Sequence, residues 1–98
     1  MPPFVFLSTR FKPGAFSTEC LFELTTYSGE PYFGLAPIDY CFNERHDQLS
    51  PTDPHQGHAI DGLIQALLVD NGGDKCRVSI PDGATIEVNA SILHSCAA

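Results

Sequence analysis

The sequence predicts a mainly β domain of antiparallel strands, because of its alternating runs near the C-terminus and the glycine turns between them. Apolar and polar residues alternate in three short runs, 62–69, 75–80 and 84–88. Two turn segments, 70–74 and 81–83, separate the runs, and their glycines allow the positive φ angles that tight reversals need. We therefore expect an antiparallel meander in the last third of the chain.

Length and charge limit the number of domains and the class of partner. The chain has 98 residues, of which 43% are hydrophobic and 17% charged, and this suits one folded domain spanning 1–98. Twelve Asp and Glu outnumber five Lys and Arg, for a net charge of −7. Nucleic acids and acidic membrane surfaces require clustered positive charge, so neither is an expected partner.

The N-terminal third predicts a hairpin or an arm. Apolar residues occur at 4–7 and again within 16–26, on either side of a Pro-Gly pair at 13–14 that is typical of a type II turn. Within the second segment Cys20, Phe22 and Leu24 share one face of a strand, as in a half-buried strand of a sheet.

Residues 31–42 are interpreted as an extended, aromatic-rich segment. Pro31 and Pro37 cannot donate to a strand ladder, so we expect an edge strand or an arm, which could also pair between subunits.

The aromatic side chains of this region are the candidate contact residues. They are interpreted as a surface for an extended peptide or a second copy of the chain, because aromatic rings give a large contact area at low entropy cost. The alternative is that the rings close the core, which suits Phe33 and Phe42 best. The candidate binding residues are Tyr27, Tyr32, Phe33 and Tyr40.

Three further segments complete the pattern. Residues 43–59 are expected to form a long polar loop. The apolar residues of 59–69 also fit helical spacing, and a helix there would make the fold α+β. Residues 91–93 predict a single 3₁₀ turn, and the chain is expected to fray from His94 onward.

Histidines and aspartates in the polar loop are the sole metal-like cluster of the sequence. His46, His55 and His58 could bind a metal ion or exchange protons beside a carboxylate. A solvated loop with incidental histidines explains the same residues, so we expect no metal ion and no cofactor.

Four cysteines, Cys20, Cys41, Cys76 and Cys96, form no Cys-x-x-Cys pair. No basic residue precedes the first apolar stretch, as it would in a signal peptide, so we expect a cytoplasmic protein with reduced, buried thiols. Two disulfides in an exported protein are the alternative. A nucleophilic thiolate is best placed at Cys41, close in sequence to Arg45 and His46.

Residues 62–93 resemble the strand plan of SH3-like small barrels such as Tudor and KOW domains. Gly62, the glycines 72–73, the Pro-Asp-Gly turn 81–83 and the short turn 91–93 carry this resemblance. It implies about five antiparallel strands with an N-terminal hairpin or arm. No aromatic residue follows Phe42 to build a Tudor-type cage, and the acidic balance opposes the RNA binding of KOW domains. The small size also resembles that of proteins carried on mobile gene cassettes.

Fold and composition together predict a non-enzymatic module for protein binding or self-assembly. The alternative is a small enzyme or metal-binding protein that uses the histidine-rich loop.

Overall fold

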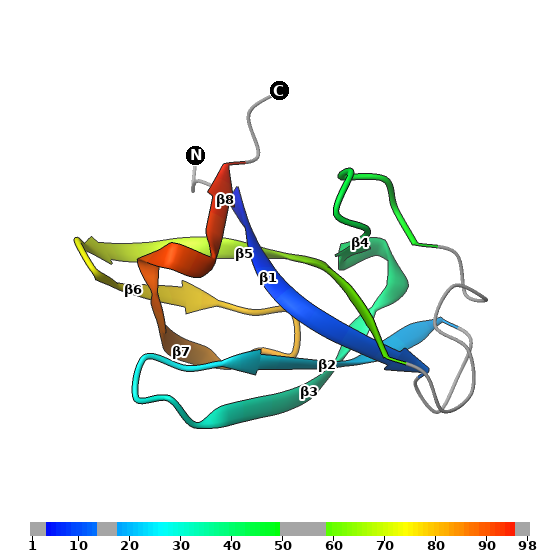
Figure 1. The fold of residues 1–98 in the computed structure, drawn as a ribbon, viewed down its shortest axis with the longest axis horizontal. Coiled ribbons are helices and arrows are strands. Elements are labelled where there is room, and N and C mark those ends of the chain that lie inside the picture. Colours follow the sequence, from blue (N-terminus) through cyan, green and yellow to red (C-terminus); the bar gives the residue numbers. More distant parts are fainter. Residues whose placement is uncertain (1–3, 14–17, 50–58, 96–98) are drawn as a thin grey trace.

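The computed structural model describes residues 4–13, 18–49 and 59–95, and these form a mainly β domain (Figure 1). The prediction of a small antiparallel, barrel-like β fold is confirmed, although the described residues form eight strands where about five were expected. The elements are β1 (Phe4–Pro13), β2 (Glu19–Thr25), β3 (Pro31–Pro37), the 3₁₀ helix η1 (Ile38–Tyr40), β4 (Cys41–Phe42), β5 (Ile60–Gly72), β6 (Lys75–Ser79), β7 (Thr85–Asn89), the 3₁₀ helix η2 (Ala90–Ile92) and β8 (Leu93–Ser95).

All strand pairs are antiparallel, and the main path of the sheet runs β3-β2-β1-β5-β6-β7. The short strands pair off this path, β4 with β5 and β8 with β1. The sheet curls into a half-barrel in which β1 crosses the middle and the β2-β3 hairpin passes beneath it (Figure 1). Strand β3 therefore forms one end of the sheet path and β7 the other.

The core fills the inside of this curl. Alternate residues of β1 point inward, and Leu7 and Phe11 are fully buried, as is Phe22 of β2. The predicted inward face of Cys20, Phe22 and Leu24 is confirmed, since none of these side chains is more than 3% exposed. Leu21 and Glu23 alternate with them and are half-buried. The predicted hairpin of β1 and β2 is also confirmed by their antiparallel pairing.

The alternative of a helix over 59–69 is wrong, because residues 60–69 lie within the long strand β5. Leu63 and Ile64 point to opposite faces, and both are buried. Ile64 belongs to the core, whereas Leu63 pairs with Phe42 on the outer face, where the Phe42 ring packs on Phe6 with centroids 5.0 Å apart. Because both faces of the strand are buried, apolar residues occupy consecutive positions in the sequence. This pattern resembles the spacing of apolar residues in a helix.

The C-terminal elements partly follow the prediction. The 3₁₀ turn is present, one residue earlier than expected, as η2. Fraying from His94 onward is wrong for His94 and Ser95, because β8 pairs with β1 and places them opposite Phe6 and Val5. In the described part of the chain, neither 3₁₀ segment approaches the length and apolar character of a membrane-spanning helix.

Candidate functional site

The edge of β3 that points away from β2 is defined by the phase of the hydrogen bonds between the two strands. The Thr26 N–H donates to the Glu30 carbonyl at 2.9 Å, and the Ile38 N–H donates to the Thr18 carbonyl at 2.8 Å. These two bonds lie at opposite ends of a continuous register between β2 and β3. In an antiparallel pair, bonded and non-bonded residue pairs alternate. Every even-numbered residue of β3 therefore bonds to β2, and every odd-numbered residue directs its backbone groups away from β2.

Two of the outward-directed positions are prolines. Pro31 and Pro37 have no N–H, so the outward donors of β3 are the N–H groups of Phe33 and Leu35. Among the described strands, none other than β2 pairs with β3. The edge thus offers two donors and their carbonyl acceptors, bracketed by prolines.

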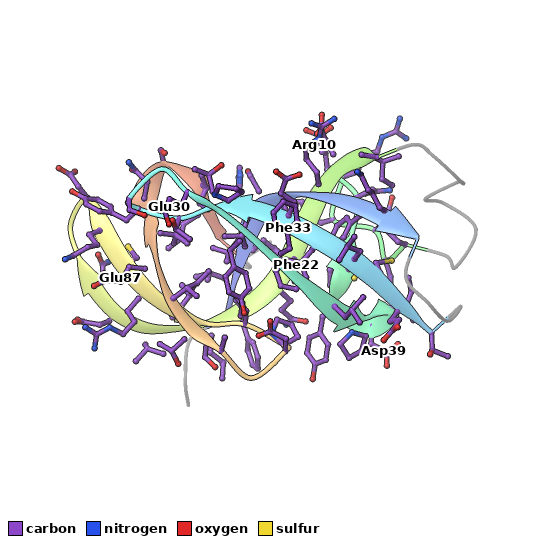
Figure 2. The ribbon with its side chains drawn as sticks, turned by 90° about the horizontal axis from the view of Figure 1, so that it is seen from below. Arg10, Phe22, Glu30, Phe33, Asp39 and Glu87 are labelled. Carbon is purple, nitrogen blue, oxygen red and sulfur yellow. The ribbon has the colours of Figure 1, made fainter. Side chains whose placement is uncertain are left out.

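The side chains beside this edge are apolar and exposed. Phe33 is 57% exposed and Leu35 is 43% exposed, and both lie on the outer face of the sheet. The register places Leu35 beside Leu21 and Phe33 beside Glu23. We call Leu21, Phe33, Leu35 and the outward backbone groups of β3 the β3 surface. Figure 2 looks from below onto the β2-β3 hairpin and labels Phe33 of this surface.

The inner face of β3 is fixed by packing. The Tyr32 ring stacks on Phe22 with centroids 6.0 Å apart, and its hydroxyl donates to Asp82 Oδ2 at 2.7 Å. This hydrogen bond raises the pKa of Tyr32, with smaller contributions from burial and from the Asp82 charge. A Cβ added at Gly34 would lie 2.6 Å from Asp82 Oδ2 and 2.8 Å from the Phe22 ring. These contacts hold β3 to the rest of the barrel without using its outer edge.

The four aromatic residues predicted for binding do not lie together. Tyr27 is exposed on the β2-β3 turn, where its N–H donates to the Glu87 carbonyl and Lys75 Nζ lies 5.6 Å from its ring centroid. Tyr40 is exposed on η1 and lines a shallow groove with Phe4.

Of the two predicted residues on β3, Tyr32 points inward, which leaves Phe33 as the predicted residue on the β3 surface. The expectation that Phe33 packs in the core is wrong, since β3 directs its odd-numbered side chains outward.

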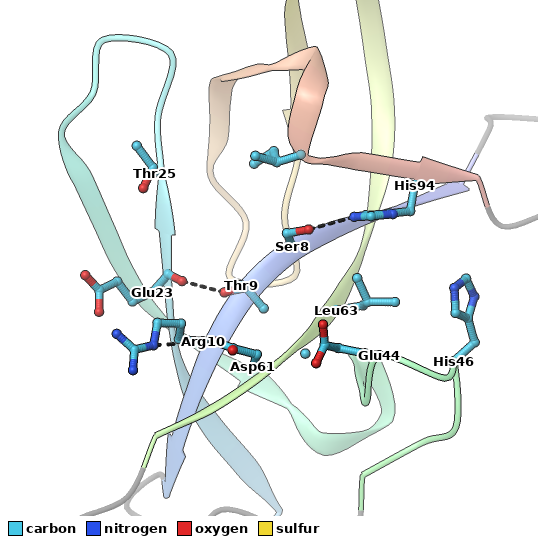
Figure 3. Close-up of a pocket in the computed structure, with 12 residues that line it drawn as sticks. Ser8, Thr9, Arg10, Glu23, Thr25, Glu44, His46, Asp61, Leu63 and His94 are labelled. Carbon is cyan, nitrogen blue, oxygen red and sulfur yellow. Dashed lines mark hydrogen bonds and ion pairs between the residues drawn. The ribbon is translucent and has the colours of Figure 1, made fainter.

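A cavity of about 390 Å³, lined mostly by polar and charged residues, lies on the outer face of β1 (Figure 3). Among its lining residues, Ser8 Oγ and His94 Nε2 lie 2.6 Å apart, and Arg10 Nε lies 3.6 Å from Asp61 Oδ1. The cavity therefore combines a hydroxyl–imidazole pair with a solvent-exposed ion pair. Its remaining lining residues are Thr9, Glu23, Thr25, Glu44, His46, Gly62, Leu63 and Ile92.

The predicted histidine cluster is only partly visible. His46 lines the cavity, and its ring meets Phe6 edge-on with centroids 4.9 Å apart. His55 and His58 lie outside the described residues. Within the described ranges, no group of three or more His, Cys, Asp or Glu side chains is placed to hold a metal ion.

The thiol of Cys41 is placed for packing rather than for nucleophilic attack. Cys41 is fully buried, and its Sγ lies 3.5 Å from the Pro37 carbonyl oxygen. A hydrogen bond with Cys20 and burial both raise the pKa of Cys41 far above that of a free thiol. A nucleophilic cysteine requires the opposite shift.

Comparison of the chain with protein-family models, curated proteins and solved structures found no match. The candidate sites are therefore assigned from geometry. Sequence reasoning missed Leu35, because apolar residues occur at both odd and even positions between Pro31 and Pro37 and do not show which face points outward. It also missed the Ser8–His94 pair, for which the sequence has no local signal because the two residues are 86 positions apart.

Proposed function

We propose that the chain is a non-enzymatic module for protein binding or self-assembly, and that the β3 surface is its contact site. The observation that carries this proposal is the pair of outward N–H groups at Phe33 and Leu35 on an edge strand with exposed apolar side chains. An extended segment can add to such an edge, where main-chain hydrogen bonds supply affinity and neighbouring side chains supply specificity.

The strand order supports the resemblance to SH3-like barrels. β5, β6 and β7 pair in succession and a 3₁₀ turn follows β7, as in the strand plan that residues 62–93 resemble. The hairpin of β2 and β3 extends this arrangement from β1. Such a fold serves many functions, so the proposed role rests on the β3 surface and not on the likeness.

The charge of the chain supports a protein partner. A net charge of −7 disfavours nucleic acid and acidic membranes. We place this module in the cytoplasm, where buried thiols such as those of Cys20 and Cys76 stay reduced.

Leu35→Pro tests the proposal because it removes an outward N–H without touching the ladder to β2. The strand already accommodates proline at 31 and 37, which direct their backbone groups to the same side. Leu35→Thr is the matched control, since it shortens the apolar side chain and keeps the N–H.

A displayed library of random peptides, selected on the immobilised protein, provides the measurement. We expect extended, apolar peptides that bind the wild type and Leu35→Thr and lose binding to Leu35→Pro. Selected peptides that bind Leu35→Pro as well as the wild type would contradict the use of this edge. Thermal unfolding of each variant establishes that it is folded.

A small enzyme remains the second candidate function, favoured by the hydroxyl–imidazole pair in the cavity. A histidine that accepts the proton of a serine hydroxyl can activate it as a nucleophile. This candidate predicts slow hydrolysis of activated aryl esters that is lost in Ser8→Ala and in His94→Gln. Equal hydrolysis by the wild type and both variants would refute it.

A further inference from the structure

We infer that the partner of the β3 surface is a second copy of the chain, paired antiparallel to the first about a two-fold axis at Gly34. The inference rests on the proposed function and names its partner.

The sequence of β3 is symmetric about Gly34 in the features that matter for pairing. Phe33 and Leu35 are both apolar and each has an outward N–H, and one of them lies on either side of Gly34. Pro31 and Pro37 lie three positions from Gly34 on either side. A surface that pairs with itself about a two-fold axis must be self-complementary in this way.

Antiparallel pairing about Gly34 satisfies every outward donor of the strand. Phe33 of one copy lies opposite Leu35 of the other, and outward-directed residues that face one another exchange both of their N–H···O=C bonds. The two-fold axis generates the equivalent pair, Leu35 of the first copy and Phe33 of the second. Two pairs with two bonds each give four hydrogen bonds. At the next outward positions Pro31 faces Pro37, and the ladder ends because neither residue has an N–H to donate. The same prolines limit the pairing to one short ladder and so oppose extended aggregation.

Charge and side-chain contacts agree with this partner. β3 contains no charged residue, so two chains that each carry a net charge of −7 can meet here without like charges opposed in the ladder. On the outer face each Phe33 would lie beside Leu35 of the other copy. Each such row ends in Leu21 on the side of Leu35 and in Glu23 on the side of Phe33. Cross-strand pairs of aromatic and aliphatic side chains stabilise a sheet.

The resulting interface is small, so we expect a weak dimer that depends on protein concentration. Gly34 faces Gly34 at the axis, and its inner side stays packed against Phe22 and Asp82 as in the single chain. The pairing therefore leaves the inner contacts of Gly34 unchanged.

Sedimentation velocity from low to high micromolar protein tests the partner. We expect the wild type to pass from monomer to dimer, Leu35→Pro to weaken the dimer by about a hundredfold and Leu35→Thr by about tenfold. A wild type that stays monomeric throughout would overturn the inference, as would a Leu35→Pro protein that dimerises like the wild type.

If the wild type is monomeric and selected peptides still depend on the Leu35 N–H, the inference fails and the proposed function stands. If the selected peptides bind Leu35→Pro as tightly as the wild type, the proposed function fails.

Cross-linking tests the register with Phe33→Cys and Leu35→Cys, each made in a Cys96→Ser background. Directly opposed residues have Cα atoms about 5.5 Å apart, within the reach of a disulfide. Identical positions lie on the diagonal, about 7–8 Å apart, and fall outside it. An oxidised mixture of the two variants is expected to give disulfide-linked heterodimer in excess of either homodimer. Homodimers in equal or greater yield would overturn the register about Gly34.

Discussion

The Tyr32 hydroxyl donates a 2.7 Å hydrogen bond to Oδ2 of Asp82, a residue 50 positions further along the chain. This bond joins β3 to the turn between β6 and β7 from the inner face of the strand. The outer edge and the outer face of β3 take no part in it. The strand is thereby held in place while its outward N–H groups pair with none of the described strands.

Removal of the Tyr32 hydroxyl is expected to reduce stability by a small amount. Tyr32→Phe keeps the ring stacked on Phe22 and deletes the hydrogen bond, so we expect a loss of about 0.5 kcal/mol, reduced by solvent at this partly exposed site. Urea unfolding measures it. Tyr27→Phe is the control, because the Tyr27 hydroxyl makes no hydrogen bond to the described residues.

The same variant is expected to change the dependence of stability on alkaline pH. Folding raises the pKa of Tyr32 above its ordinary value of 10.0, so the unfolded chain loses this proton first. The stabilisation is therefore complete below pH 10.0 and is lost as the pH rises through the raised pKa. Tyr32→Phe should show a smaller loss of stability over that interval than the wild type. Identical alkaline profiles would contradict the role given to this bond.

Gly34→Ala is expected to destabilise the fold by about 1–3 kcal/mol. The added Cβ would meet Asp82 Oδ2 and the ring of Phe22, and that ring is fully buried and cannot move aside freely. Urea midpoints of the variant and the wild type measure the effect.

A double-mutant cycle with Phe22→Leu identifies its cause. If the ring of Phe22 is the obstacle, Gly34→Ala should cost less in the Phe22→Leu background than in the wild type. An equal cost in both backgrounds would show that the contact with Phe22 is not responsible.

Three thiols are expected to be protected in the folded protein. Cys20, Cys41 and Cys76 are buried, and the pKa of Cys41 is raised by its hydrogen bond with Cys20 and by burial. A thiol reagent applied at mildly alkaline pH should therefore react with these three residues only after denaturant is added. Counting reactive thiols before and after unfolding measures this. Rapid reaction of Cys41 in the native protein would be inconsistent with its place in the core.

The parts of the fold that followed from sequence are those with one buried face. The alternation of Cys20, Phe22 and Leu24 identified β2, and Pro31 and Pro37 identified the edge strand. The segment around Leu63 and Ile64 stayed ambiguous because both of its faces are buried.

The candidate site was less accessible to sequence reasoning. The outward direction of the Phe33 and Leu35 N–H groups depends on the register between β2 and β3, which local pattern does not determine. The opposite directions of the Tyr32 and Phe33 side chains follow from the same strand assignment. The Ser8–His94 contact depends on the pairing of β1 with β8, from opposite ends of the chain.

The central claim is that the outward edge of β3 is free in the single chain and pairs with a second copy. Amide hydrogen exchange of β3, followed residue by residue by NMR at low and at high protein concentration, tests it most directly. In dilute protein we expect slow exchange at Tyr32, Gly34 and Ala36 and fast exchange at Phe33 and Leu35. At high concentration Phe33 and Leu35 should become protected as well. Fast exchange at these two amides at every concentration, or protection already present in the dilute monomer, would contradict the account.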